Sequence, residues 1–199
     1  MPPPPSGLEK PIKDAEQPAG VPRVALSSYQ YLFNELAFWQ RDHPSPAPDH
    51  TAWETRLAAL GAQVGARSVG LALVNEGPHL KHRDVTTDDV TKFVATVMFK
   101  RWFDRPAPRH GAAERAIHYI EDEEPLILPL RPPTADFGDF HYGSYIAGMI
   151  RGALEAAGFP ATVQALYPLD PPNATTQYVI QWHDSVLERE RRAGRGVPS

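Results

Sequence analysis

The side chains that could support chemistry are few and scattered along the chain. Of eight histidines, only His79 and His82 lie close together, and no HExxH or comparable metal-ligand spacing occurs. The acidic run Glu121–Glu124 supplies the oxygen ligands that Ca²⁺ and Mg²⁺ require, but it lacks the alternate spacing and the glycine of a calcium loop. We interpret this run as a solvated hairpin turn, and the sequence predicts no metal and no cofactor.

A serine nucleophile is the other catalytic possibility. Ser144 lies near His141 and Asp139, which are the residue types of an acyl-transfer triad. The apolar periodicity around Ser144 predicts a core helix, and this is a poor position for a triad. GxSxG, GxGxxG and GxxxxGK[ST] motifs are absent. We therefore expect no catalytic residues and a protein that is not an enzyme.

Composition narrows the class of protein further. A chain of 199 residues has the length of one domain, and 42% apolar residues are enough for a core. Lys and Arg number 20 against 24 Asp and Glu, a net charge of −4, which argues against a partner such as nucleic acid or an anionic membrane. Because there is no cysteine, disulfides, thiolate metal sites and cysteine nucleophiles are excluded, which agrees with a reducing, cytoplasmic setting. We expect no leader peptide and no transmembrane segment.

Proline marks the expected domain boundaries. The 22 prolines cluster, first in residues 1–25, which cannot bury enough apolar surface to offset the ordering entropy. We predict a disordered or extended N-terminal extension over 1–25, a single domain over 26–192 and a flexible tail over 193–199. The run Pro2–Pro5 could instead be a polyproline II ligand.

Helical periodicity dominates the first half of the chain. Ser27 or Ser28 can cap a helix that ends before His43, a second helix is expected over 49–75, and a third begins at Thr86. The second helix contains Gly61, Gly65 and Gly70, each of which costs about 1 kcal/mol relative to alanine, so we expect another backbone to approach it closely. The apolar stripe of the second helix is predicted to comprise Trp53, Leu57, Leu60, Val64, Leu71 and Val74.

The second half changes to strand periodicity. A hairpin is predicted from 116–120 and 126–130, followed by a helix over 140–157 that Gly158 ends. Strands over 162–167 and 177–182 and a short helix over 184–192 complete the order. The prediction is an α+β fold, with an antiparallel four-stranded sheet packed against about four main helices.

Five segments carry a resemblance to a known family. They are YLFNELAFW, RLAALGAQVGAR, FVATVMFKRWF, AIHYIEDEEPLI and YIAGMIRGALEAAGFPATVQA, in this order. In order and spacing they resemble the small subunits of the TRAPP vesicle-tethering complex, in the Bet-three-like superfamily, and most closely its subunit-five branch. The resemblance spans about residues 28–190 and implies the same α+β layout.

The resemblance also implies a function and partners. Such subunits are non-catalytic scaffold pieces of a complex that tethers vesicles in endoplasmic reticulum-to-Golgi transport and acts as guanine-nucleotide exchange factor for a Rab-type GTPase. It implies a cytoplasmic protein, peripheral to endoplasmic reticulum and cis-Golgi membranes. Its partners would be a Bet-three-like subunit bound through the first two helices, a sedlin-like subunit on another surface, and the Rab-type GTPase through the complex.

The resemblance also indicates candidate interface residues on the first two helices. An amphipathic helix needs an apolar stripe in any case, so each of these residues could equally belong to the intramolecular core. Phe38 and Trp39 lie off the main stripe, and exposed aromatic residues are enriched at interfaces. The ten candidates are Tyr29, Leu32, Phe33, Leu36, Phe38, Trp39, Trp53, Leu57, Leu60 and Val64.

Three departures and one alternative accompany the resemblance. A paralogue in the superfamily carries an acylated cysteine beside a lipid-filled channel, a feature that a chain without cysteine cannot share, and Tyr142 stands where this branch often has cysteine. The segments 104–113 and 168–176 are longer than expected and could be surface elaborations. The alternative is a small hydrophobic-ligand-binding domain of the vinyl-reductase-like type, with a pocket lined by Phe93, Val97, Met98, Tyr145 and Met149.

Overall fold

The structure, a computed structural model, describes residues 25–47, 49–76, 86–111, 116–126, 140–166 and 175–195. In the N-terminal half, the helices are α1 (Leu26–Asp42), α2 (His50–Glu76), α3 (Thr87–Phe93), a π-helical turn η2 (Val94–Met98) and α4 (Phe99–Phe103). The remaining elements are β1 (Arg109–Gly111), β2 (Ile117–Asp122), α5 (Ser144–Ala156), β3 (Ala161–Leu166), β4 (Thr176–Trp182) and α6 (Asp184–Arg195).

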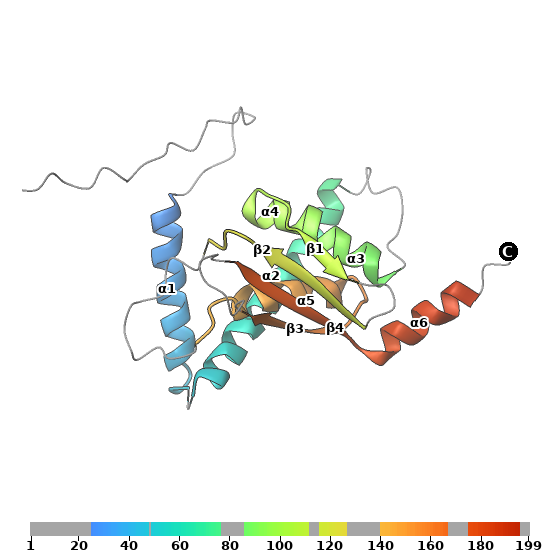
Figure 1. Cartoon of the computed structure of the whole chain (residues 1–199). Coiled ribbons are helices and arrows are strands. Elements are labelled where there is room, and N and C mark those ends of the chain that lie inside the picture. The colour runs from blue at the N-terminus through green and yellow to red at the C-terminus, as the bar shows by residue number, and fades with distance from the viewer. Residues whose placement is uncertain are drawn as a thin grey trace, which may run out of the picture.

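The four strands form one antiparallel sheet in the order β1-β2-β4-β3. Ile120 of β2 lies opposite Tyr178 of β4, and both side chains are fully buried, as is Ile180. The intervening residues of these strands are half-buried or exposed, so one face of the sheet carries most of the core. In Figure 1, α2 and α5 lie behind the sheet, α1 stands at one end and α6 projects from the other. The predicted α+β class is confirmed.

The edge strand β1 differs from the predicted sheet. The sequence pattern paired the strand at 116–120 with residues 126–130, of which 127–130 lie outside the described residues. The strand that pairs with β2 on this side is β1, inside the segment 104–113, for which the sequence left open a surface elaboration or additional contacts. Its sequence, Arg-His-Gly, has no apolar alternation, and periodicity therefore could not reveal it.

The acidic run Glu121–Glu124, predicted as a solvated hairpin turn, lies partly in a strand. Glu121 and Asp122 complete β2, and Asp122 is only 3% exposed. Its carboxylate lies 2.5 Å from the Arg105 guanidinium. Burial raises the pKa of Asp122, whereas the charge of Arg105 lowers it. The prediction was wrong here because a nearby arginine makes burial of a carboxylate tolerable.

Four of the predicted helix ends can be compared with the structure. At the start of α3, Thr86 and Asp89 form a reciprocal capping box, as the sequence indicated. Gly158 follows α5 with a φ of 83°, a conformation that glycine adopts without strain. The expected serine cap of α1 is wrong, because this helix begins after Ala25 without a side-chain cap. At the other end of the chain, α6 extends to Arg195, beyond the predicted end at 192.

The tightest packing in the structure joins α2 to α5. A Cβ atom added to Gly61 or Gly65 of α2 would overlap the carbonyl oxygen of Tyr145 or Met149 in α5. The relation is reciprocal, because a Cβ on Gly148 or Gly152 of α5 would overlap the carbonyl oxygens of Ala58 and Ala62. The backbone approach expected for Gly61 and Gly65 is therefore confirmed. Gly70 has no atom near its missing Cβ, so that glycine has no such role.

The helix α2 is unusually apolar for its degree of burial. By length and composition alone, His50–Val74 would be able to cross a membrane, with a window of mean hydropathy 1.5. The sequence predicts no such segment, because no stretch approaches the roughly 18 consecutive apolar residues of a membrane span. Only 28% of that window is buried within the chain, so much of its apolar surface is not used by the described part of the fold.

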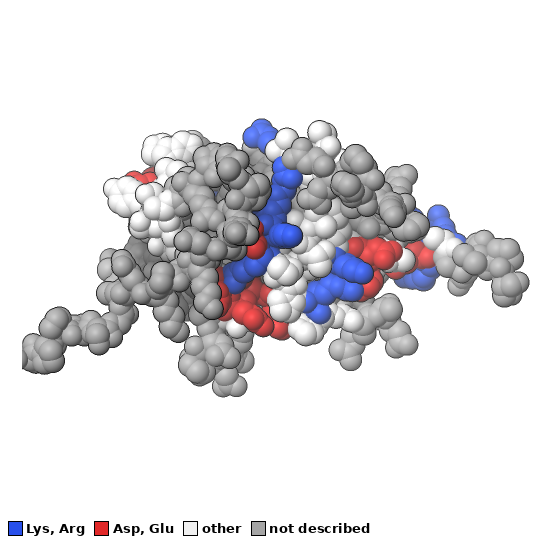
Figure 2. Space-filling model, turned by 90° about the horizontal axis from the view of Figure 1, so that it is seen from above, with Lys and Arg blue, Asp and Glu red and all other residues white. Residues whose placement is uncertain are grey.

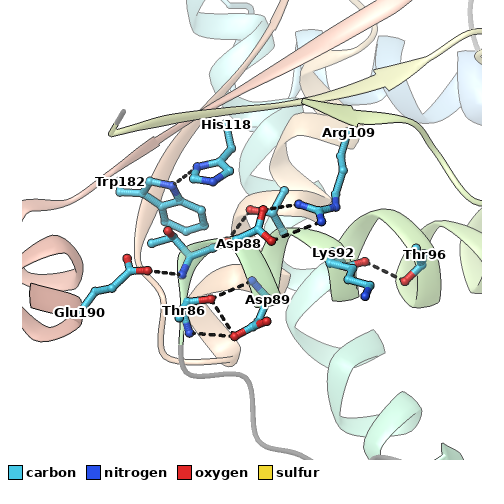
Figure 3. A network of polar contacts seen from close by, with 11 residues as sticks. Thr86, Asp88, Asp89, Lys92, Thr96, Arg109, His118, Trp182 and Glu190 are labelled. Carbon is cyan, nitrogen blue, oxygen red and sulfur yellow. Dashed lines mark hydrogen bonds and ion pairs between the residues drawn. The ribbon is translucent and has the colours of Figure 1, made fainter. Parts of the chain in front are cut away.

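A polar network ties the sheet to α3 and α6 (Figure 3). His118 of β2 is 1% exposed, and its Nδ1 accepts a hydrogen bond of 2.7 Å from Trp182 Nε1 of β4. Arg109 of β1 pairs with Asp88 of α3, and Glu190 of α6 accepts a hydrogen bond of 3.3 Å from the backbone of Thr87. Because His118 accepts through Nδ1, the imidazole is held in the neutral form.

The close approach of α2 and α5 predicts opposite effects for one substitution at different glycines. Alanine stabilises a helix by about 1 kcal/mol relative to glycine, and Gly70→Ala should therefore stabilise the chain or leave it unchanged. Gly65→Ala and Gly148→Ala should lower the free energy of unfolding by about 1–3 kcal/mol, because the added methyl overlaps a backbone carbonyl. Urea denaturation followed by circular dichroism measures these changes. Equal effects at Gly65 and Gly70 would contradict the close packing.

The buried imidazole predicts a pH dependence of stability. Burial lowers the pKa of His118, the charges of Asp88 and Glu190 raise it, and Arg109 lowers it. As the pH falls below about 6.5, the unfolded chain takes up a proton at this residue before the folded chain does. The free energy of unfolding should then decrease, by at most about 1.4 kcal/mol per pH unit.

The matched variant for this test is His118→Asn, whose amide oxygen can accept from Trp182 without titrating. Free energies of unfolding of both chains, measured in urea between pH 7.5 and 5, should differ progressively in favour of the asparagine variant at acid pH. Parallel curves would refute a titrating role for His118.

Candidate protein interface

Exposed apolar side chains concentrate on α1 and α2. Among the described residues, seven of the eight large hydrophobic residues that are exposed belong to these two helices. The most exposed on α1 are Tyr31 and Leu32, at 72% and 69%, and on α2 Val74, at 78%. The others on these helices are Leu26, Trp39, Leu71 and Leu73. An apolar set of this size on adjacent helices is typical of a surface that a partner covers.

The ten candidate interface residues divide by their burial. Leu32 and Trp39 are exposed. Phe33, Trp53 and Leu57 are buried in the core of the chain itself, so a partner cannot reach their side chains without displacing others. The five half-buried candidates are Tyr29, Leu36, Phe38, Leu60 and Val64.

Sequence periodicity placed part of the exposed set in the wrong environment. Leu71 and Val74 were placed on the same apolar stripe of α2 as Trp53 and Leu57, but they are 58% and 78% exposed. The neighbouring residues Val69 and Ala72 are buried in their place. A helix that is apolar nearly all round gives no contrast from which the inner face could be read. Tyr31 was missed because it lies off the stripe of α1.

The buried candidates hold α1 and α2 on the rest of the fold. The Trp53 ring stacks on Phe140, with centroids 3.6 Å apart, and its Nε1 donates to the carbonyl oxygen of Ala37 in α1 at 2.8 Å. The Phe33 ring lies 5.3 Å from the Tyr145 ring of α5 and 6.2 Å from the Tyr142 ring. These contacts fix the position of α1 without covering its outer face.

A single arginine organises the connection between the two helices. Arg56 of α2 donates through Nη1 to the carbonyl oxygens of Ser45 at 2.6 Å and His43 at 3.2 Å. The same nitrogen lies 3.3 Å from the carbonyl oxygens of Gln40 and Arg41, at the end of α1. A cation at this point complements the negative end of the helix dipole. The exposed residues of α1 are thereby held at a fixed angle to α2.

The predicted chemical groups do not assemble into a catalytic arrangement among the described residues. Asp139, His79 and His82 lie outside them. His141 accepts through Nδ1 from the Gly143 backbone at 3.0 Å, and Ser144 is buried. The described ranges contain no group of three His, Asp or Glu side chains that could hold a metal ion.

The residues proposed for a hydrophobic ligand pocket lie in or beside the core. Phe93, Met98 and Met149 are buried. Val97 and Tyr145 are half-buried and pack against the same core cluster. Protein interiors are close-packed, so side chains that lie in the core normally fill that space themselves.

Charge on the described surface is mixed. Seen from above, Lys and Arg form a band across the described part of that face, and acidic groups lie beside its lower end (Figure 2).

Comparisons with known proteins agree with one another. Residues 21–183 match the family described as transport protein particle (TRAPP) component. The trafficking protein particle complex subunit 5 of Homo sapiens is 28% identical over 170 residues, covering 84% of this chain and 85% of that protein. The subunit 5 of Gallus gallus is 28% identical over 181 residues, covering 88% and 90%, and that of Dictyostelium discoideum is 24% identical over 156 residues, covering 77% and 81%.

A solved structure supports the fold. It is a trafficking protein particle complex subunit 3 from Naegleria fowleri, covalently bound to palmitic acid. The TM-score is 0.64 with 16% sequence identity, covering 80% of this chain and 95% of that one. Together with the α+β sheet and the sequence matches, this fold similarity leads to one conclusion: the chain belongs to the TRAPP component family of vesicle-trafficking complex subunits.

Proposed function

We propose that the chain is a non-catalytic scaffold subunit of a TRAPP-type complex and that the apolar surface of α1 and α2 binds a second, Bet-three-like subunit. The observation that carries this proposal is the concentration of seven exposed apolar side chains on these two helices. Relatives named as subunits of a trafficking particle support it. On α1 the candidate surface is centred on Leu32 and Trp39, and on α2 it comprises Leu71, Leu73 and Val74, toward the C-terminal end of that helix.

The low burial of α2 supports the same proposal. Fully burying one leucine or valine side chain is worth about 1.5–3 kcal/mol, and Leu71, Leu73 and Val74 contribute little of this in the chain alone. A partner surface of matching apolarity would recover it. Interfaces of this kind concentrate their binding energy in a few buried aromatic and aliphatic residues, and Tyr31 and Trp39 are the aromatic residues available here.

The wider role follows from the family. We infer that the assembled complex tethers vesicles between endoplasmic reticulum and Golgi and promotes nucleotide exchange on a Rab-type GTPase. A sedlin-like subunit would bind elsewhere on the chain, and the protein would be cytoplasmic and peripheral to endoplasmic reticulum and cis-Golgi membranes. The single domain over 26–192 would provide both contacts.

The central experiment is purification of the tagged full chain from its own cells, followed by native mass spectrometry and identification of the partners. We expect a particle several times the mass of the chain, with Bet-three-like and sedlin-like subunits. A lone chain, or a homodimer that carries a lipid or chromophore, would refute the scaffold role and favour the small-ligand-binding alternative.

Two substitutions separate an interface residue from a core residue. Leu32→Asp places a charge on a side chain that is 69% exposed, so the isolated chain should keep its circular dichroism but lose most of its Bet-three-like partner. Leu57→Asp places the same charge at a fully buried position and should unfold the chain, at a cost of several kcal/mol. Thr96→Asp, at an exposed site on η2, is the control for added charge and should preserve assembly. Normal assembly of Leu32→Asp would place the interface elsewhere.

A further inference from the structure

A second surface lies at the edge of the sheet, apart from the exposed residues of α1 and α2. Here a groove of about 380 Å³ is bounded by β3, by α5 and by the first two turns of α2. Residues 162–166 of β3 line one side, and Thr51, Glu54 and Ala58 of α2 line another. In α5, Ser144, Ala147 and Arg151 face the groove.

Hydrogen bonding leaves one side of β3 open. His183 N donates to Pro160 O at 3.2 Å, so these two residues form a hydrogen-bonded pair. Hydrogen-bonded and non-hydrogen-bonded pairs alternate along an antiparallel ladder. Thr162 and Gln164 of β3 are therefore also hydrogen-bonded to their partners in β4. On the other side of β4, Trp182 N donates to Ala116 O at 3.1 Å, as the same alternation requires. The N–H and C=O groups of the three intervening residues therefore point away from β4, toward the free edge; they belong to Ala161, Val163 and Ala165.

This edge lacks two of the features that protect edges from pairing. The sequence of β3, ATVQAL, contains no charge and no proline, the devices that natural sheets use to block another strand. Within the described residues, β3 is the last strand of the sheet. Its exposed Leu166, at 48%, is the one large exposed hydrophobic residue outside α1 and α2 among those described. An edge of this composition is typical of one that is covered by another strand in the working protein.

The groove beside this edge contains polar atoms that lack a partner in the described chain. Arg151 Nε and Ser144 Oγ are buried and have no hydrogen-bond partner there. The Arg151 side chain is 37% exposed and forms an ion pair with Glu155, whose carboxylate is 3.9 Å from Nε, but this distance is too long for a hydrogen bond. A buried, unsatisfied guanidinium donor costs free energy, and a carboxylate is the group that satisfies it best.

The one carboxylate in the groove is already occupied. Glu54 Oε1 accepts a hydrogen bond of 2.8 Å from the His141 backbone. Burial raises the pKa of Glu54, although that hydrogen bond and the charge of His50 lower it. Arg151 is ion-paired with Glu155, so what remains open in the groove is the hydrogen-bond donor at Arg151 Nε.

We propose that this groove binds an extended, acidic segment of a partner protein, which pairs with β3 as a fifth strand and places an Asp or Glu carboxylate on Arg151. Strand addition supplies main-chain hydrogen bonds to Ala161, Val163 and Ala165, and side chains supply specificity. Residues alternate every second position along a strand, so side chains on one face of the added segment enter the groove. The small residues Ala58 and Ala147 leave them room.

The test uses the full chain and a displayed library of random dodecapeptides. Enriched peptides are expected to alternate β-forming residues and to share one acidic position; their affinities are then measured by fluorescence polarisation. Arg151→Gln should weaken binding about tenfold or more, with partial recovery in Arg151→Lys. Replacing the acidic residue of the peptide by its amide should cause the same loss, and no further loss in the Arg151→Gln chain.

Strand pairing is tested separately from charge. Val163→Pro removes an N–H that faces the free edge and spares the bonds to β4, a position at which edge strands tolerate proline. It should abolish peptide binding, whereas Val163→Thr, with the same shape and an intact N–H, should preserve it. If Val163→Pro fails to fold, the same question can be asked with two versions of the peptide, each N-methylated at every second amide. Only the version that blocks the amides facing β3 should lose binding, because the other amides point away from the sheet.

Four outcomes would overturn the proposal. The first is that no peptides are enriched, and the second is that binding survives both Arg151→Gln and the loss of strand pairing. The third is that replacing the acidic residue of the peptide leaves the affinity unchanged. The fourth is complete competition by millimolar acetate, which would indicate a pocket for small anions. The Leu32→Asp chain should bind the peptides normally, so this result is independent of the interface proposed for α1 and α2.

Discussion

The close contact between α2 and α5 is the constraint on which the rest of the fold depends. Glycines on each helix face backbone carbonyls of the other, so the two axes approach more closely than larger side chains would permit. This contact joins α5, which also packs against β3, to the part of α2 between Ala58 and Gly65. Since Gly61 and Gly65 reduce the helix propensity of α2, packing energy between the helices must compensate for them.

The same contact explains why α2 retains so much apolar surface. An amphipathic helix normally buries its large apolar side chains, but where α2 meets α5 it does so through the small residues Ala58, Gly61, Ala62 and Gly65. Its larger residues Leu71, Leu73 and Val74 are consequently left outside. Arg56 and Trp53 then hold α1 beside the first turns of α2, whereas Leu71, Leu73 and Val74 lie toward the other end of that helix.

The sequence predicted the elements better than it predicted their faces. Long periodic segments, the Thr86 capping box and the glycine contacts at Gly61 and Gly65 could be read from local patterns, because each has a local physical cause. The strand β1 could not be predicted, since three residues without apolar alternation join the sheet only through pairing with β2. The exposure of Leu71 and Val74 could not be predicted either, because it depends on α5 occupying the opposite side of α2. The family resemblance supplied the expectation of a partner, and burial then indicated which side chains are free to meet it.

The helix α2 contributes to both candidate surfaces at different points along its length. Its first two turns, at Thr51, Glu54 and Ala58, border the groove beside β3, whereas Leu71 to Val74 lie at its other end. Ala58 also supplies a carbonyl to the glycine contact with α5, so the residue that permits the close approach also helps to leave the groove open. A rigid α2 would therefore hold two binding surfaces at a fixed separation, which is the physical requirement for a subunit that joins different neighbours in one assembly.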